Sequence, residues 1–83
     1  MWTNTEISLH LGQRLGQRRR ELRLSLAQVA ERCGVSLQQV HKYETGQNMI
    51  SGSMLFQLAL CLDVPASYFF EVLEEERAAR QAC

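Results

Sequence analysis

The fold of this chain is decided by the stretch Ser36-Leu37-Gln38-Gln39-Val40-His41-Lys42-Tyr43-Glu44-Thr45-Gly46. Ser36 and Gln39 fit a capping box, in which each side chain hydrogen-bonds the backbone amide of the other residue. Gly46 suits the left-handed position that follows the end of a helix. The sequence therefore predicts a short helix over residues 36–45.

This short helix has two chemically different faces. At about 100° per residue, Val40, Tyr43 and Glu44 fall within one sector and are expected to face inward. The opposite side carries the polar residues Gln38, His41, Lys42 and Thr45. Because a helix of this length is unstable alone in water, the rest of the chain must hold it in place. An outward face of amides and one lysine is suited to a DNA groove.

The composition predicts one small all-α domain. The chain has 83 residues, of which 46% are hydrophobic, with one proline and five glycines. This share is ample for a packed core and argues against a disordered chain. No apolar run approaches the roughly 20 residues of a membrane span, and no basic residue precedes Arg14. We therefore expect no membrane association, no secretory signal and a cytoplasmic location.

The cysteines and histidines predict neither a metal site nor a cofactor. Cys33, Cys61 and Cys83 contain no C-x-x-C pair, and His10 and His41 lie at no ligand-like spacing. We expect reduced thiols, with the first two cysteines serving as small hydrophobic residues at helix ends. The sequence also shows no nucleophile–base pair, carboxylate pair or phosphate loop, so we expect no enzymatic activity.

Charge divides the chain into two halves. Residues 1–50 hold seven basic and four acidic residues, whereas residues 51–83 hold two basic and five acidic residues. This asymmetry suggests one side that faces a polyanion and one side that is kept away from it. An ordinary solvated surface is the alternative.

The first half of the chain carries the start and stop signals of a helix-turn-helix unit. Residues 1–8 lack sustained periodicity and are expected to form a flexible arm before a helix over residues 9–22. Ser25 and Gln28 fit a second capping box that opens a helix, and Gly34 ends it. Two capped helices joined by a tight turn with glycine are typical of the helix-turn-helix motif.

The second half predicts two further helices. One is expected to begin near Ser51 or Ser53, with a core face made by Leu55, Leu58, Ala59 and Leu62. Asp63 replaces the usual glycine after this helix, which is tolerable because aspartate visits the left-handed region. Pro65 suits the first turn of the last helix. The domain is expected to cover residues 9–73, followed by a tail over 74–83 that favours helix by composition.

From about Leu9 to Phe70 the chain resembles the Cro and phage-repressor type of helix-turn-helix domain, the xenobiotic-response-element family. The matching motifs are L-G-x-R-L from Leu11, S-L-A-Q-V-A-E-R-C-G-V-S from Ser25, Q-Q-V-x-K-Y-E-x-G from Gln38 and L-x-x-L-A-x-x-L-D-V-P from Leu55. The resemblance implies a compact five-helix bundle. In such a bundle the helix over residues 36–45 is the recognition helix, whose N-terminal part enters the major groove of double-stranded DNA.

The resemblance places base reading on Leu37, Gln38 and Lys42, and His41 shares their outward face. The chemistry agrees, because glutamine can bridge adenine N6 and N7, lysine can donate to guanine, and leucine can contact a thymine methyl. Ordinary solvated helix surface is the alternative for each residue, more so for Leu37 and His41.

The resemblance also assigns phosphate contacts and one internal ion pair. The phosphate-contacting positions are Ser36, Gln39, Thr45, Gln47 and Asn48, to which we add Arg14 and Arg18 of the first helix. Arg19 and Glu44 are expected to pair and to tie the first helix to the recognition helix. Three features depart from the family pattern: Leu26 replaces a glutamine, Arg23 replaces a glycine, and Met49-Ile50 replaces a basic loop. The first and third remove phosphate contacts, so we expect weaker binding per subunit.

One domain of this kind binds one half-site, so a homodimer on a palindromic operator is expected. The expected dimer interface comprises Phe56, Leu60, Tyr68, Phe69, Val72 and Leu73, although one small core could also absorb these side chains.

The leading interpretation is a dimeric transcriptional repressor of bacterial or phage origin, located with the nucleoid. An antitoxin of a toxin–antitoxin pair and a restriction-modification controller are alternatives that bind DNA similarly. An alternative of another class is a protein-interaction module with weakened DNA binding and an unknown protein partner, a reading favoured by the missing glutamine at Leu26. Salt-dependent DNA binding separates these classes.

Overall fold

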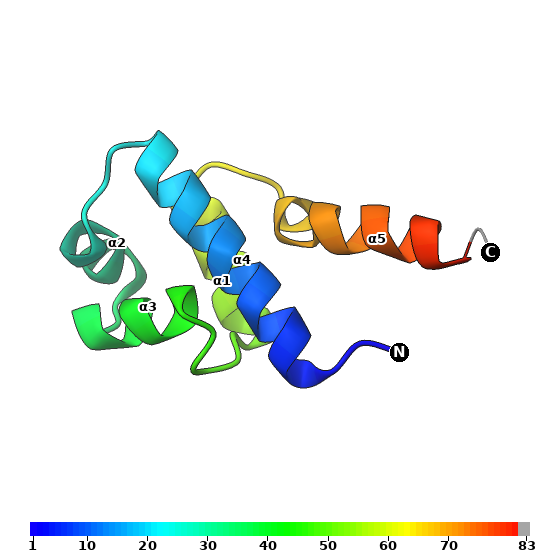
Figure 1. Cartoon of the computed structure of the whole chain (residues 1–83). Helices are drawn as coiled ribbons and strands as arrows, with labels where there is room; N and C mark the ends of the chain where they lie inside the picture. The colour runs from blue at the N-terminus through cyan, green and yellow to red at the C-terminus, as the bar shows by residue number, and fades with distance from the viewer. Residues whose placement is uncertain (82–83) are drawn as a thin grey trace.

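The computed structural model describes residues 1–81, which form α-helices and one 3-10 helix without strands. The elements are α1 (Asn4–Glu21), α2 (Leu26–Cys33), α3 (Leu37–Glu44), α4 (Gly52–Cys61), the 3-10 helix η1 (Ala66–Phe70) and α5 (Glu71–Gln81). Figure 1 shows α2 and α3 together on one side of α1, while α5 projects from the other side. The predicted all-α class with five helices is confirmed.

Hydroxyl side chains start the first four helices. Thr3, Ser25, Ser36 and Ser51 each accept a hydrogen bond from the backbone amide three residues later. The capping box at Ser25 and Gln28 is complete, as predicted. At α3 only the hydroxyl half forms, with the Gln39 amide donating to Ser36 Oγ at 3.0 Å. The Gln39 side chain is therefore not needed to cap α3.

Helix α1 begins earlier than predicted. The Glu6 amide donates to Thr3 Oγ1 at 3.1 Å, so the helix starts at Asn4 and most of the expected arm over residues 1–8 is helical. Ser8 is only 6% exposed, and its hydroxyl donates to Met49 Sδ at 3.3 Å. The sequence shows little apolar periodicity here because Ser8, a polar residue, takes a buried position against the loop after α3.

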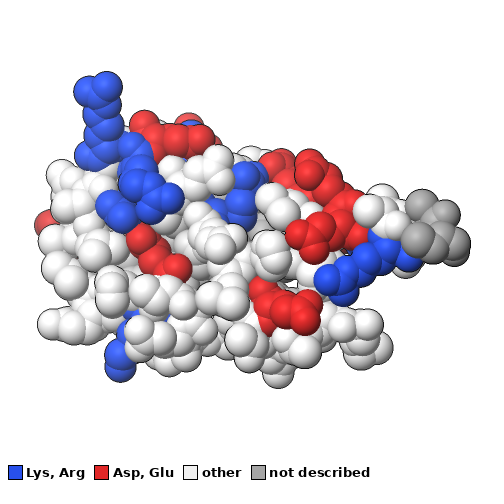
Figure 2. Space-filling model, in the orientation of Figure 1, with Lys and Arg blue, Asp and Glu red and all other residues white. Residues whose placement is uncertain are grey.

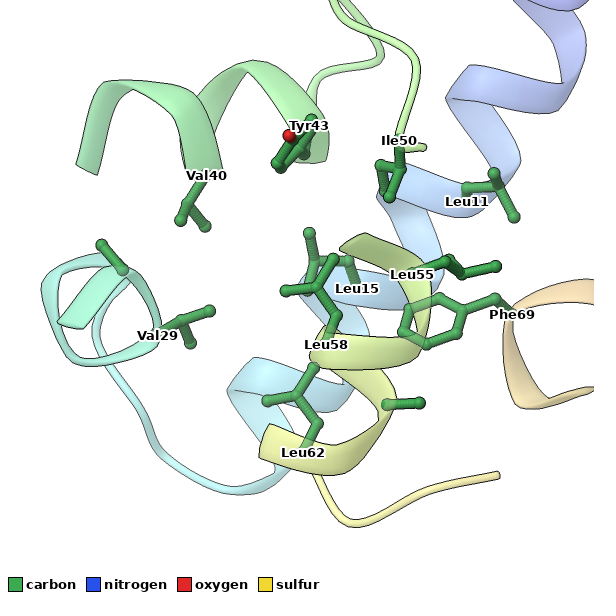
Figure 3. Packing of buried hydrophobic residues seen from close by; sticks show 12 residues of the cluster. Leu11, Leu15, Val29, Val40, Tyr43, Ile50, Leu55, Leu58, Leu62 and Phe69 are labelled. Atoms are coloured by element: carbon green, nitrogen blue, oxygen red, sulfur yellow. The ribbon is translucent and has the colours of Figure 1, made fainter. Parts of the chain in front are cut away.

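The core surrounds α4. Its predicted core face is confirmed, since Leu55, Leu58, Ala59 and Leu62 are all buried. Figure 3 shows the ring of Phe69, from η1, lying against Leu55 and Leu58. Burial of these side chains supplies most of the free energy that holds the short helices together.

The last predicted helix is divided in two. Pro65 lies just before η1 rather than inside it, and the chain changes from 3-10 to α geometry between Phe70 and Glu71. Helix α5 then runs to Gln81, so the tail predicted to favour helix is helical that far. Residues 82–83 of that tail lie outside the described residues.

Two turns place non-glycine residues in the left-handed region. Arg23 has φ 57° after α1, and Asp63 has φ 56° after α4, as predicted for the aspartate. A residue with a Cβ atom pays about 1–2 kcal/mol in this conformation. Arg23 is exposed, so little side-chain packing offsets that cost.

Replacing Arg23 with glycine is expected to stabilise the fold by about 0.5–1 kcal/mol, because relief of the Cβ clash exceeds glycine's extra entropy in the unfolded chain. Thermal unfolding followed by circular dichroism should show Tm rising by about 4 °C. Arg23→Ala is the matched control, since it removes the charge but keeps the Cβ atom. A glycine variant no more stable than the alanine variant would refute this explanation.

Candidate nucleic-acid interface

The inward face of α3 is fixed by apolar packing. Val40 and Tyr43 are buried in the core, and Figure 3 shows Val40 pointing toward Val29 of α2. The inward sector predicted from the sequence thus contains buried side chains, and its third member, Glu44, forms a polar contact with α1.

Arg19 and Glu44 form a bidentate ion pair between α1 and α3. Arg19 Nε donates to Glu44 Oε2 at 2.6 Å, and the guanidinium also donates to Glu44 Oε1 at 3.1 Å. A third bond runs from Arg19 Nη1 to the carbonyl oxygen of Leu24 at 3.0 Å. The two side chains are 16% and 11% exposed, so the pair is largely shielded from water. Paired in this way, the arginine is structural, and it joins α1, α3 and the turn after α1.

Two glycines of α1 allow α3 to approach closely. A Cβ atom at Gly12 would lie 2.2 Å from the Tyr43 carbonyl oxygen and 2.8 Å from that of Glu44. At Gly16, one turn later, a Cβ atom would lie 3.1 Å from Glu44 Oε1. Sequence reasoning gave these glycines no role. The available signal was a pair of glycines four residues apart inside a helix, where glycine costs about 1 kcal/mol relative to alanine.

The outward face of α3 carries the predicted base-reading residues. Leu37, Gln38, His41 and Lys42 are all exposed. In the described part of the chain, no hydrogen bond or ion pair engages the side chains of Gln38, His41 or Lys42. The structure therefore brings these four residues together on one accessible surface of a fixed helix.

The predicted phosphate-contacting residues near α3 differ in availability. Ser36 Oγ caps α3, and Thr45 Oγ1 donates to the His41 carbonyl oxygen at 3.1 Å. The amides of Gln47 and Asn48 donate to the Lys42 carbonyl oxygen at 2.9 and 3.4 Å. The hydroxyls and these amides thus already serve the fold, whereas the side chain of Gln47 is exposed.

Arg14 and Arg18 have partners elsewhere in the chain. Arg14 donates to the Tyr68 carbonyl oxygen at 3.0 Å, pairs with Glu71, and lies 3.7 Å from the centre of the Tyr68 ring. Arg18 Nε donates to the Leu62 carbonyl oxygen at 2.9 Å. Both arginines therefore hold η1 and the end of α4 against α1. We leave them out of the proposed DNA surface, because a phosphate would have to displace these contacts.

This internal use of arginines reduces the charge that the α3 side offers to a polyanion. Arg14, Arg18 and Arg19 account for three of the seven basic residues before residue 51. Figure 2 shows acidic side chains gathered over the half of the molecule that holds α5. The charge asymmetry read from the sequence persists as an acidic α5 end, with Lys42 as the basic residue on the α3 surface.

Two of the family-pattern departures have a packing explanation. Leu26 is half-buried and packs against the core, and Ile50 is buried within it. These side chains serve stability at positions where other family members are expected to contact phosphate.

The predicted dimer residues separate into two groups. Phe69 is fully buried and Leu73 is nearly so. The prediction that these two residues lie in the dimer interface was therefore wrong. Tyr68 and Val72 are half-buried. Phe56 and Leu60 are 58% and 63% exposed, and their spacing of four residues puts them on one face of α4.

Within residues 1–81, no group of three or more histidine, cysteine, aspartate or glutamate side chains is placed to hold a metal ion. No single helix in this range is long and apolar enough to cross a membrane. Residues 52–61 and 66–81 together have the length and composition of a membrane span, but the two helices are bent by 114° relative to each other.

Sequence comparison gives similarities over most of the chain. A sequence model of the helix-turn-helix family matches residues 15–69. The chain is 50% identical over 68 residues to an uncharacterized transcriptional regulator in the ATPase CF(0) region of Rhodospirillum rubrum, covering 82% of this chain and 63% of that protein. It is 40% identical over 70 residues to the HTH-type transcriptional regulator y4aM of Sinorhizobium fredii, covering 84% of this chain and 49% of that protein. The chain therefore spans only part of these relatives.

Two solved structures have similar folds. The restriction-modification controller protein C.AhdI from Aeromonas hydrophila matches with a TM-score of 0.73 and 30% identity, over 76% of this chain and 96% of the controller. An HTH_3 family transcriptional regulator from Vibrio cholerae matches with a TM-score of 0.78 and 26% identity, over 83% of this chain and 39% of that protein.

Proposed function

The chain belongs to the helix-turn-helix family of DNA-binding transcriptional regulators, and from this premise we propose that it is a dimeric repressor that reads a palindromic operator with α3. In this proposal Gln38 and Lys42 read base edges, and Leu37 and His41 add contacts beside them. We propose that the protein acts by binding DNA and not as an enzyme. We also propose a cytoplasmic location, with the protein bound to the nucleoid.

The observation that carries this proposal is the contrast between the two faces of α3. The inward face is held by buried Val40 and Tyr43 and by the Arg19–Glu44 pair. The outward side chains of Gln38 and Lys42 are exposed and have no internal partner in the described chain. A rigid helix with unpaired donors and acceptors can contact the major groove without first breaking internal bonds.

Limited positive charge supports the dimeric part of the proposal. Because Arg14 and Arg18 bind within the chain, each subunit offers few cations to the phosphates. The electrostatic, sequence-independent share of binding should then be small for one subunit. Two linked half-sites restore affinity, because the second contact becomes intramolecular once the first has formed.

We propose that Phe56 and Leu60 form the centre of the subunit interface. They are the most exposed large apolar side chains on α4, and Phe70 is a further partly exposed aromatic residue at the end of η1. Exposed apolar side chains of this size on one helix face favour association. Half-buried Tyr68 and Val72 can add to the edge of this interface, whereas Phe69 and Leu73 belong to the core.

A restriction-modification controller is the second candidate. One observation favours it specifically: the match to C.AhdI covers 96% of that controller at 30% identity, so this chain matches nearly its whole length. The protein-interaction module remains an outcome of the test below, and no described contact favours the antitoxin.

Selection of bound sequences from a random DNA pool tests the proposal. We expect a palindrome with half-site centres about 34 Å apart, which is one helical turn of DNA. Affinity for the selected site should fall as salt rises, because bound phosphates release counterions. Sedimentation should show a dimer at tens of micromolar, a concentration at which an interface with a dissociation constant of about 1 µM, or about 8 kcal/mol of binding free energy, is mostly formed.

The matched control is a double variant, Gln38→Ala with Lys42→Ala, which should fold normally because both side chains are exposed and unpaired. Failure of the native protein to enrich any sequence, in a sample that is folded and dimeric, would favour the protein-interaction module. A monomer at these concentrations would rule out the proposed interface.

A further inference from the structure

Packing of α2 on α4 brings two cysteines into contact. Cys33 is the last residue of α2 and Cys61 the last residue of α4, and their sulfur atoms lie 3.3 Å apart. The Cys33 thiol donates to the Cys61 sulfur, and the Cys61 thiol donates to the Arg32 carbonyl oxygen at 3.6 Å. Both side chains are half-exposed free thiols. The sequence spacing of the two residues does not reveal this contact.

The two sulfur atoms are close enough for a disulfide to form after a small movement. A disulfide bond is about 2.05 Å long, so the two sulfurs need to approach by only a little more than about 1 Å. Each cysteine lies at the end of a helix, followed directly by a turn that contains a left-handed residue, Gly34 or Asp63. Helix ends and turns can absorb a shift of this size more easily than the middle of a packed helix can.

We propose that Cys33 and Cys61 form a reversible intrachain disulfide when the protein meets a low-molecular-weight disulfide oxidant. The bond joins the end of α2 to the end of α4. Its first partner, Cys33, lies three residues before Ser36, which caps α3. Such bonds in intracellular proteins are typically transient and respond to redox conditions. This oxidation site is independent of the proposed operator binding.

The order of reaction follows from the environment of the two thiols. Burial, together with the hydrogen bond to Cys61 and the charge of that residue, raises the pKa of the Cys33 thiol to about 12. The Cys33 thiol is also the donor in the hydrogen bond between the two sulfurs, so we assign the first attack to Cys61.

Two thiol–disulfide exchanges form the bond. Cys61 loses its proton to solvent, and the resulting thiolate attacks one sulfur of the oxidant. The S–S bond of the oxidant breaks, and one small thiolate leaves and takes up a proton from solvent. Cys33 then loses its proton to solvent and attacks the Cys61 sulfur of the mixed disulfide, which releases the second small thiolate. The protein loses two electrons and two protons in forming its S–S bond, and the oxidant gains both to become two small thiols.

The bond would enclose the recognition helix. The loop between Cys33 and Cys61 contains all of α3 and most of α4. Closing a loop of this length restricts the unfolded chain, so the oxidised protein should melt at a Tm higher by about 10 °C or more.

The test uses the 83-residue chain carrying Cys83→Ser, so that the third cysteine does not contribute. The folded protein is treated with oxidised glutathione at neutral pH, free thiols are counted, and the linked peptides are identified by mass spectrometry. We expect loss of both thiols, a peptide pair containing Cys33 and Cys61, no covalent dimer, and a higher Tm. Dithiothreitol should restore both thiols and the original Tm.

Cys33→Ser and Cys61→Ser, each in the same background, are the controls, and neither should show the rise in Tm. Stable glutathione adducts without the internal bond would overturn the proposal. So would a bond that forms only in denaturant, or one that lowers Tm.

Discussion

Alanine at position 12 is expected to lower the Tm of the protein by about 10 °C, because the new Cβ atom cannot fit between α1 and α3. It would lie 2.2 Å from the Tyr43 carbonyl oxygen, which is backbone and cannot rotate away. Overpacking of this kind costs about 3 kcal/mol, whereas alanine's better helix propensity returns about 1 kcal/mol. The net loss of about 2 kcal/mol follows from the difference between these two effects.

The same substitution should weaken DNA binding beyond its effect on stability, because relief of the clash requires α3 to move away from α1. Gly52→Ala is the matched control: nothing lies within 4 Å of a Cβ atom at Gly52, so its Tm should not fall. Circular dichroism melts of the two variants provide the comparison. Equal Tm values would mean that the close crossing of α1 and α3 is not a constraint on the fold.

Removal of Arg19 is expected to destabilise the protein by about 3 kcal/mol, the lower end of the range for breaking a buried ion pair. The lower end applies because both partners keep some exposure, at 16% and 11% of their side-chain surface. Arg19→Ala leaves the Glu44 carboxylate without its two hydrogen bonds, and it also leaves the Leu24 carbonyl oxygen without its Arg19 donor. Urea unfolding measures this loss directly.

Arg19→Lys is an informative control, because it keeps the charge but cannot donate the two parallel bonds of a guanidinium. We expect it to lie between the native protein and Arg19→Ala in stability. The double variant Arg19→Ala with Glu44→Ala should be less destabilised than the sum of the single variants, since no unpaired carboxylate remains. Additive effects across this cycle would show that the pair contributes no coupling energy.

The features that could be predicted from the sequence are governed by local chemistry. Ser25 with Gln28 forms the complete capping box that was predicted, whereas at Ser36 with Gln39, which have the same spacing, only the hydroxyl half forms. Asp63 takes the predicted left-handed turn conformation. The inward sector of α3 also followed from helix periodicity, since Val40 and Tyr43 are buried.

The features that could not be predicted depend on contacts between distant segments. Arg14 and Arg18 share a helix with Arg19, yet their partners lie in η1 and at the end of α4, which no local pattern reveals. Phe69 and Phe70 are adjacent in sequence, but only the first is fully buried, because a 3-10 helix sets its direction toward α4. The contact of Cys33 with Cys61 likewise arises from packing alone.

These contacts divide the molecule into a bracing part and a contacting part. Gly12, Gly16, Arg19 and Glu44 set the position of α3, and changes there are expected to alter stability and DNA binding together. Gln38 and Lys42 take no part in the bracing, so changes there should alter DNA binding alone. Variants of the two groups can therefore be distinguished by measuring Tm and affinity on the same samples.

The most direct test of base reading by α3 is the base preference of Lys42→Ala. The variant and the native protein are compared on the selected operator and on every single base-pair change within one half-site. We predict an unchanged Tm and a loss of about 1–3 kcal/mol of discrimination at one base-pair position, repeated symmetrically in the other half-site. A uniform loss of affinity across all of these sequences would contradict the account, because it would mean that Lys42 contacts only the phosphate backbone.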